Sequence, residues 1–183
     1  ALGQFIATLP SFSPFIPNIG VLAKQIDFTN KDITYRSVYG QYNWGRFELS
    51  GEWVHIDSGA LPLEEVSKAF VNLSYQNNNH TFYLSYSFVE SDAYKFSETV
   101  VDPELVQQVI FGIEEVVNTF RHNQNTTSLG WRWDVTETTA LKVQWQNVNI
   151  DPRGGGLQKV DGFRILATKE TFNNLFASVS FTF

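Results

Sequence analysis

Residues 128–146 read SLGWRWDVTETTALKVQWQ and change polarity at every second position on both sides of a short polar interruption. From Leu129 to Val135 every second side chain is apolar or aromatic, and from Leu141 to Trp145 the same alternation returns. A period of two is typical of a β-strand with one apolar face. Only residues 136–139 separate the two runs, which is short enough for a hairpin. This stretch therefore predicts two antiparallel strands that carry their apolar side chains on a single face.

Further strands with the same pattern are predicted before and after this hairpin. One hairpin spans residues 38–53 around a turn at 43–45, and another spans 68–88 around three asparagines at 77–79. The final residues 175–183 alternate once more, and a weaker run at 20–28 adds a less regular strand. The sequence thus predicts an all-β, antiparallel fold of about eight strands.

Composition excludes several classes of protein. The chain has 183 residues, enough for one domain, and its 15 % aromatic content suits strands better than a helical bundle. It has no cysteine, so disulfides and thiolate metal sites are excluded. A formal net charge of −6 without any basic run argues against a nucleic-acid partner. No apolar run reaches the ~20 residues of a membrane helix, but barrel strands need only ~9–11 alternating residues.

The lengths of the connections alternate along the chain. Connections near 43–45, 76–80 and 136–139 are tight, whereas those at 58–66, 93–124 and 151–171 are long. In an antiparallel meander this alternation places all short turns at one end of the strands and all long loops at the other. Transmembrane β-barrels show this asymmetry, whereas β-sandwiches mix loop lengths at both ends. The pattern favours a transmembrane β-barrel whose long loops face outward.

The chemistry of the two strand faces indicates which face contacts lipid. A soluble barrel or sandwich also alternates, but it would have to enclose a very bulky aromatic face. We therefore expect the aromatic face to contact lipid and the charged face to line the lumen. Aromatic residues near strand ends are interpreted as membrane-interface anchors: Tyr42, Trp53, Tyr75, Trp145 and Phe183.

Charged residues opposite the apolar face are the candidate site. They either set the ion preference of a wide pore or pair with one another and close a narrow one. They are Arg46, Glu48, Glu52, Lys68, Arg132, Asp134 and Lys142. The three histidines, His55, His80 and His122, have no metal-ligand spacing, and no Ser–His–Asp order emerges. No catalysis, metal or cofactor is predicted.

The long connection at 93–124 contains an amphipathic segment. Pro103 suits the first position of a helix, and apolar residues recur from Leu105 to Phe120 at helical spacing. The sequence predicts a loop helix over 103–120 that caps the barrel mouth, enters the lumen or packs on a partner. Residues 1–19 contain three prolines and no clear period, and we expect an irregular segment there, followed by a β-barrel domain over 20–183.

Residues 124–145, QNTTSLGWRWDVTETTALKVQW, resemble the penultimate hairpin of Gram-negative outer-membrane porins. The last strand, 173–183, and the stretches VYGQYNWGRFELSGEWVHID and FYLSYSF are similar to further strands of that family. The resemblance covers roughly residues 33–183. The chain departs from the family in length, because such porins are about twice as long and have ~16 strands. It is therefore either the carboxyl part of a larger porin or a compact barrel with little open pore.

The resemblance implies a function and a location. A porin in the bacterial outer membrane passes small hydrophilic solutes or ions by passive diffusion, contacts outer-membrane lipid and can form a homotrimer. The family's assembly machinery reads a terminal aromatic strand, which here corresponds to Val179, Phe181 and Phe183. Two alternatives remain open at this point: a non-conducting outer-membrane barrel that acts as an anchor or interaction scaffold, and a soluble periplasmic ligand-binding β-domain.

Overall fold

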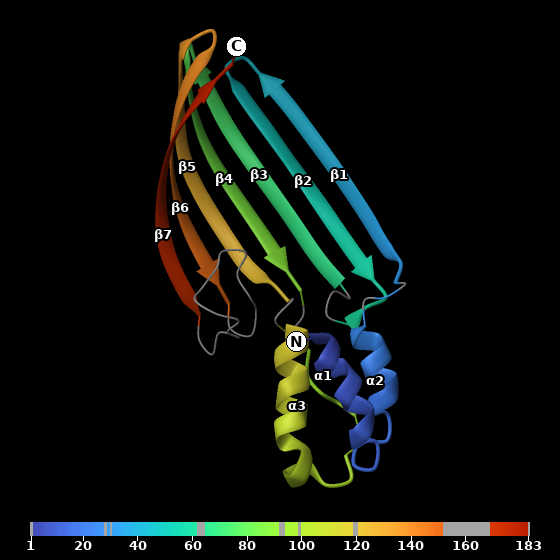
Figure 1. The fold of residues 1–183 in the computed structure, drawn as a ribbon. Helices are drawn as coiled ribbons and strands as arrows, with labels where there is room; N and C mark the ends of the chain where they lie inside the picture. Colours follow the sequence, from blue (N-terminus) through green and yellow to red (C-terminus); the bar gives the residue numbers. More distant parts are fainter. Residues whose placement is uncertain are drawn as a thin grey trace.

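A computed structural model describes residues 2–27, 29, 31–61, 65–91, 94–98, 100–118, 121–151 and 169–182. Seven strands form one antiparallel sheet in chain order (Figure 1). The strands are β1 (Ile33–Trp44), β2 (Phe47–Ser58), β3 (Glu65–Asn77), β4 (His80–Glu90), β5 (Asn123–Thr136), β6 (Thr139–Ile150) and β7 (Glu170–Phe181). The prediction of an antiparallel β-fold is confirmed, although the described strands form an open sheet with β1 and β7 at its edges.

The predicted hairpins pair as the alternation requires. In β5 and β6, Trp131 pairs with Val143 and Trp133 with Leu141, and a bulge near Asp134 adjusts the register before the turn. Two of the tight turns use left-handed backbone conformations, at Gly45 (φ 60°) and Asn78 (φ 53°). Glycine and asparagine are the residues that adopt this conformation most readily.

The amino-terminal region differs from its prediction. The weak strand expected at 20–28 is instead the helix α2 (Ile19–Ile26), and the irregular segment expected at 1–19 contains α1 (Leu2–Thr8) and the 3-10 helix η1 (Leu9–Phe12). Ile19, Leu22, Ala23 and Ile26 are all buried, at the spacing of one helical face. Leu22 and Ile26 are four residues apart and therefore fit both a period of two and a helical turn. Phe28 lies outside the described residues.

The predicted loop helix is present as α3 (Pro103–Asn118); residues 119 and 120 of the prediction are outside the described part. Together α1, η1, α2 and α3 form what we call the helical unit, which lies beyond the strand ends on the side of the long connections (Figure 1). Its buried residues come from the amino-terminal segment and from α3: Leu9, Ile16, Ile19, Leu22, Ala23, Ile26, Val106, Ile113 and Val117. The apolar stripe of α3 is thus buried by the amino-terminal helices.

Polar contacts connect α3 to the chain that precedes it. The Asn118 side chain accepts a hydrogen bond from the Tyr94 backbone N–H (2.7 Å) and donates one to the Tyr94 carbonyl (2.9 Å). Glu114 accepts from the backbone N–H of Phe96 (2.8 Å). Asn18 donates to Glu98 (3.0 Å) and so joins the amino-terminal segment to the same connection.

Tyr94 should make the helical unit sensitive to alkali. Burial, followed by the nearby carboxylates of Glu98 and Glu114, raises the pKa of Tyr94 to about 12 from 10.0. The unfolded chain therefore loses this proton first, and the unit should lose stability as pH rises from about 10 to about 12. We expect the helical circular-dichroism signal to fall in that window, and Tyr94→Phe to move the fall to higher pH. An unchanged midpoint in the variant would contradict this role of Tyr94.

The two ends of the sheet differ as the connection lengths predicted. The tight turns after β1, β3 and β5 and the carboxyl end of β7 lie at one end, while the helical unit lies at the other (Figure 1). Most of the third long connection, residues 152–168, is outside the described residues. No helix in the described part of the chain has the length and apolarity needed to cross a bilayer.

Candidate functional site: the two faces of the sheet

Strand register separates the side chains into two faces. One continuous row across the sheet is Tyr42, Leu49, Leu73, Leu84, Leu129, Trp145 and Leu175, and it belongs to what we call the apolar face. The neighbouring row is Gln41, Ser50, Asn72, Ser85, Ser128, Gln146 and Asn174, and it belongs to the polar face. The predicted alternation therefore holds across all seven described strands.

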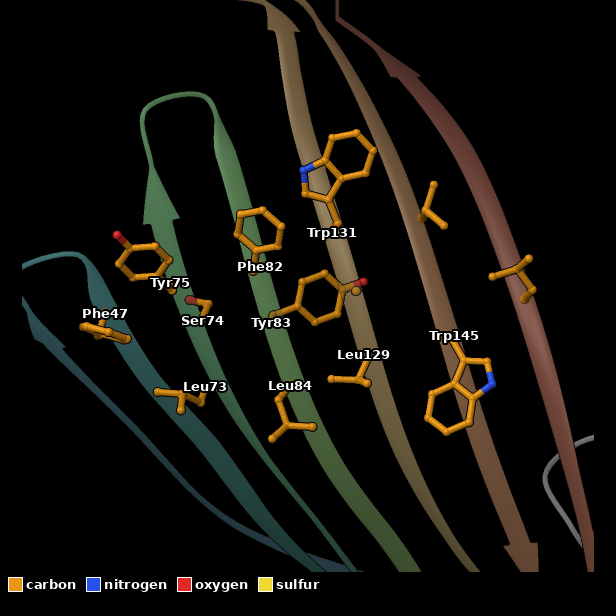
Figure 2. A pocket seen from close by; sticks show the side chains of 13 residues that line it. Phe47, Leu73, Ser74, Tyr75, Phe82, Tyr83, Leu84, Leu129, Trp131 and Trp145 are labelled. Carbon is orange, nitrogen blue, oxygen red and sulfur yellow. The ribbon is translucent and has the colours of Figure 1, made fainter.

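The apolar face carries large side chains that no described element covers. Leu84 is 46 % exposed, Leu129 51 % and Leu175 73 %. Figure 2 shows the central side chains of this face spreading from β2 to β6 along one side of the sheet. All five tryptophans of the chain lie on it: Trp44, Trp53, Trp131, Trp133 and Trp145. Soluble monomers rarely leave so large a continuous apolar patch in water.

Four of the five predicted interface aromatics, Tyr42, Trp53, Tyr75 and Trp145, lie on the apolar face. Trp53 is followed on its face by His55, and Trp145 by Asn147, so each marks the point where the apolar side chains end. Phe183 lies outside the described residues. On β7, Val179 and Phe181 are 52 % and 66 % exposed on the same face.

The apolar band runs obliquely across the strands. On β1 to β4 it extends toward the long connections as far as the paired row Val38, Trp53, Ala69 and Phe88. The same row continues on β5 to β7 as Asn125, Asn149 and Thr171, and there the band has already ended at Leu129, Trp145 and Leu175. The boundary is thus displaced four residues toward the tight turns, or about 13 Å at ~3.3 Å per residue.

Uncharged polar residues replace the apolar band on β5 to β7. Asn147 donates to Asn173 (3.0 Å), and Asn149 donates to Asn147 (2.9 Å) and to Asn125 (3.3 Å). Thr171 donates to Asn149 (2.8 Å). These contacts give hydrogen-bond partners to side-chain amides that are half-buried or exposed, so this part of the face suits a polar environment.

Six of the seven predicted lumen residues share the polar face: Glu48, Glu52, Lys68, Arg132, Asp134 and Lys142. Arg46 does not, because it lies in the turn between β1 and β2, where its guanidinium donates to Asn77 (2.7 Å). The two glutamates lie on β2, whereas Arg132 and Lys142 are register partners on β5 and β6. Glu48 and Glu52 therefore lie on a different strand from the basic side chains, whereas Asp134 shares β5 with Arg132.

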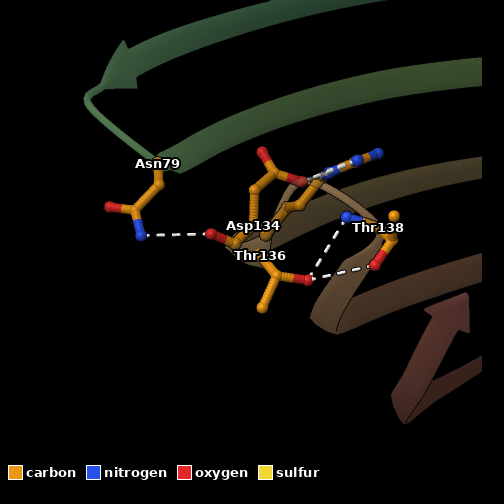
Figure 3. Close-up of polar contacts among 5 residues, drawn as sticks. Asn79, Asp134, Thr136 and Thr138 are labelled. Carbon is orange, nitrogen blue, oxygen red and sulfur yellow. Dashed lines mark hydrogen bonds and ion pairs between the residues drawn. The ribbon is translucent and has the colours of Figure 1, made fainter.

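Arg132 and Asp134 form an ion pair of 2.7 Å near the tight-turn end of β5. The backbone of Asp134 also bonds to Asn79, because its N–H donates to the Asn79 carbonyl (2.8 Å) and its carbonyl accepts from the Asn79 side chain (3.1 Å). Figure 3 shows the ion pair and the bond from the Asn79 side chain to the Asp134 carbonyl, beside the Thr136–Thr138 turn. They hold two neighbouring turns together and keep the Arg132 side chain close to a carboxylate.

A second contact group crosses the middle of the polar face. A Cβ placed on Gly130 would overlap the Tyr83 ring, so this ring lies directly over the glycine. The Tyr83 hydroxyl donates to Gln144 (2.6 Å), and the Lys142 ammonium is 5.2 Å from the Tyr83 ring centroid. A cation at this distance from an aromatic ring is stabilised by it. The alternation of polar and apolar residues did not predict this group, although a glycine inside a strand signals close approach of another group.

Gly130→Ala should destabilise the protein by about 1–3 kcal/mol, because the Tyr83 ring must move and lose its bond to Gln144. Equilibrium unfolding of Gly130→Ala, Tyr83→Ala and the double variant measures the coupling. The double variant should lose less than the sum of the single losses. Gly40→Ala is the matched control, since open space surrounds that position. Additive effects of the two changes would contradict the packing described.

The described residues contain no group of three or more His, Cys, Asp or Glu side chains that could hold a metal ion. His55 contacts Ser67 (3.2 Å), and His80 accepts from the indole N–H of Trp131 (3.2 Å). His80 lies at the tight-turn end, and His55 lies toward the opposite end of its strand. The absence of catalysis stays a prediction from the sequence.

No protein-family model matches this sequence, and no characterised protein matches it by sequence. Among solved structures, the chain is similar to OccK10 (OpdN) of Pseudomonas aeruginosa, an outer-membrane porin, with 14 % sequence identity and a TM-score of 0.42. The match covers 82 % of this chain and 49 % of that one, so the chain spans about half the length of OccK10. A TM-score at this level does not establish a common fold.

Proposed function

We propose that this chain forms wall strands of a porin-type β-barrel in the outer membrane of a Gram-negative bacterium. The barrel passes small hydrophilic solutes or ions by passive diffusion. One observation carries the proposal: an uncovered sheet face that holds every tryptophan of the chain is backed by a face of charged and amide side chains. The mechanism uses no cofactor.

Lipid is the environment that suits the apolar face. At ~25 cal/mol per Å² of apolar surface, an exposed face of this size is costly to keep in water. A soluble sandwich covers such a face with a second layer, but the described helices lie beyond the strand ends (Figure 1). Acyl chains supply that cover in a bilayer, and the aromatic residues at the margins of the band suit the headgroup region.

The oblique course of the apolar band also supports contact between this face and lipid. Strands of membrane barrels tilt by ~35–45° from the barrel axis, so a band that is level with the bilayer must cross the hydrogen-bonded rows obliquely. The boundary of the apolar band crosses these rows obliquely in the same way, because it is displaced by four residues between β4 and β5. The amides of Asn147, Asn149 and Asn173 then lie beyond the hydrocarbon, with the long connections.

The polar face supports a selective aqueous path. Glu48 and Glu52 on β2 and Lys142 on β6 stand on separate strands of a curved sheet, so they set up a field across the space they line. Arg132 contributes less net charge because Asp134 pairs with it. Within the described residues, Lys142 contacts an aromatic ring and has no carboxylate within ion-pair distance. We assign to Lys142 the largest effect on ion preference.

Assembly and oligomerisation extend the proposal. Val179 and Phe181 project from an edge strand on the apolar face, where the outer-membrane assembly machinery can reach them. A homotrimer follows from the family resemblance alone and belongs to the same proposal.

Tryptophan fluorescence in vesicles tests the orientation of the faces. Since all five tryptophans lie on the apolar face, lipids with brominated acyl chains should quench the emission strongly, and aqueous iodide should quench it weakly. Strong iodide quenching without any effect of the brominated lipid would overturn the proposal and favour a soluble β-domain.

Planar-bilayer recording tests conduction. Stepwise currents are expected, and Lys142→Glu should shift the reversal potential toward cation preference. Arg36→Glu is the matched control, because Arg36 is exposed on the opposite side of the sheet, next to the apolar band. If the bilayer shows no currents while the fluorescence result is as expected, the channel hypothesis is wrong and a non-conducting outer-membrane scaffold is favoured.

A further inference from the structure

A hollow of about 270 Å³ lies on the polar face and spans β2 to β5. Two neighbouring rows of the sheet contribute its side chains. One row contains the register partners Glu52 and Phe70, and the other contains the register partners Val54 and Lys68. Pockets for drug-sized ligands have volumes of ~300–1,000 Å³, so this hollow has the size for a small solute.

Glu52 and Lys68 bring one negative and one positive charge to the same hollow. They lie diagonally on neighbouring strands, because Lys68 precedes by two residues the register partner of Glu52. Diagonal neighbours on one face are ~7–8 Å apart, a distance that long side chains can bridge. Among the described residues, however, no ion pair joins either group to the other or to a third side chain. Both charges can therefore pair with a solute.

Apolar side chains surround the two charges. Val54 and Val89 are the register partners of Lys68 on its two sides, and Phe70 is the partner of Glu52. Val89 is 3 % exposed and closes the hollow from β4, whereas Phe70 is 38 % exposed and keeps part of its ring open to a solute. The hollow thus combines two opposite charges with an apolar wall.

This combination discriminates between classes of solute. A simple cation is attracted by Glu52 and repelled by Lys68, and a simple anion meets the reverse, so an ion of one sign gains little. A neutral sugar displaces water from both charges without supplying a counter-charge, which costs free energy. The amide of Gln124 offers it little, because this buried side chain already donates to Thr126 (3.1 Å). A zwitterion satisfies both charges at once.

We infer that the hollow binds small zwitterionic solutes of the amino-acid type that carry an apolar side chain. The ammonium of the solute lies at Glu52, where the neighbouring Phe70 ring also stabilises a cation. Its carboxylate lies at Lys68, and its side chain packs against Val54 and Val89. The inference rests on the proposed function, because the hollow lies on the face that lines the proposed aqueous path.

Binding of L-leucine tests the inference directly. Saturation-transfer difference NMR of the protein in deuterated detergent measures weak binding, and protein-free micelles serve as the blank. Three probes each lack one feature of leucine: 4-methylpentanoate lacks the ammonium, 3-methylbutylamine lacks the carboxylate, and glycine lacks the apolar side chain. We expect leucine to bind about fivefold more tightly than each of them, the usual effect of one contact at a half-exposed site. No leucine binding, or equal binding of leucine and 4-methylpentanoate, would overturn the inference.

Two variants separate recognition of the charges from a structural role. Glu52→Gln should weaken leucine binding about fivefold and tighten the binding of 4-methylpentanoate, because the carboxylate that repels this anion is gone. Lys68→Gln should also weaken leucine binding, but it should tighten the binding of 3-methylbutylamine. Glu65→Gln is the matched control, because Glu65 is exposed on the other face of β3. If Glu52→Gln and Lys68→Gln change the binding of all probes in the same direction, the inference is wrong.

The inference and the proposed function fail through different measurements. If tryptophan quenching and bilayer currents are as expected but leucine does not bind, the proposed function stands and the inferred class of solute is wrong. If iodide quenching places the apolar face in water, the proposed function is wrong, and the inference that depends on it is overturned as well.

Discussion

Leu84→Arg should lower the free energy of unfolding measured in lipid by about 2–4 kcal/mol, the effect of a cation at the bilayer midplane on the lipid face of a barrel. Leu84 lies at the centre of the apolar face on β4 and is 46 % exposed. In a protein surrounded by water, a cationic side chain at so exposed a site would change stability little, by about 0.5 kcal/mol or less. The size of the effect therefore reports which medium the face contacts.

Ser87→Arg is the matched control for this change, because Ser87 lies on the same strand but on the polar face. Glu52 and Lys68 border the same hollow, so the added charge meets one carboxylate and one ammonium there. Urea unfolding in lipid vesicles, followed by tryptophan emission, should show a large loss for Leu84→Arg and a small one for Ser87→Arg. Equal losses, or the larger loss at Ser87, would contradict the assignment of the faces.

Ile113→Ala should destabilise the helical unit by about 2–5 kcal/mol, the usual cost of removing a fully buried aliphatic side chain. Ile113 on α3 has no solvent exposure and lies in one cluster with Leu9, Ile19 and Leu22. Hydrogen exchange should accelerate in α3 and in α2 together, because each buries the apolar stripe of the other. Exchange in the central strands β3 to β5 should stay unchanged, since the unit lies beyond the strand ends (Figure 1).

Phe111→Ala is the control for the helical unit, because Phe111 lies on the same helix and is 62 % exposed. Its effect on exchange in α2 should be small. Faster exchange in α3 alone after Ile113→Ala, with α2 unaffected, would show that the two helices do not share a core.

Much of the sheet was predictable because strand periodicity is a local property. The alternation from Leu129 to Trp145 determined which side chains share a face, and short turns with asparagine or glycine determined the hairpins. The same reasoning placed Glu48 and Lys142 on the polar face but misplaced Arg46, since a residue in a two-residue turn no longer follows the alternation of its strand.

The amino-terminal helices were not predictable in the same way. Leu22 and Ile26 fit either period and led to the predicted strand, although Ile19, Leu22, Ala23 and Ile26 together follow the helical spacing. The buried residues of α2 belong to one cluster with residues of η1 and with Val106, Ile113 and Val117 of α3, more than 70 residues later in the sequence. Long-range packing of this kind overrides local propensity.

The sequence by itself determined the alternating strands after residue 33, their pairing in hairpins and the chemical character of each face, because all of these depend on neighbours in the chain. Only the tertiary structure decided that Tyr83 lies over Gly130, that α3 shares a core with the amino-terminal helices, and that β1 and β7 are the edge strands of the described sheet. These features depend on register, on contacts between distant segments and on how many strands pair, none of which the alternation of polar and apolar residues encodes.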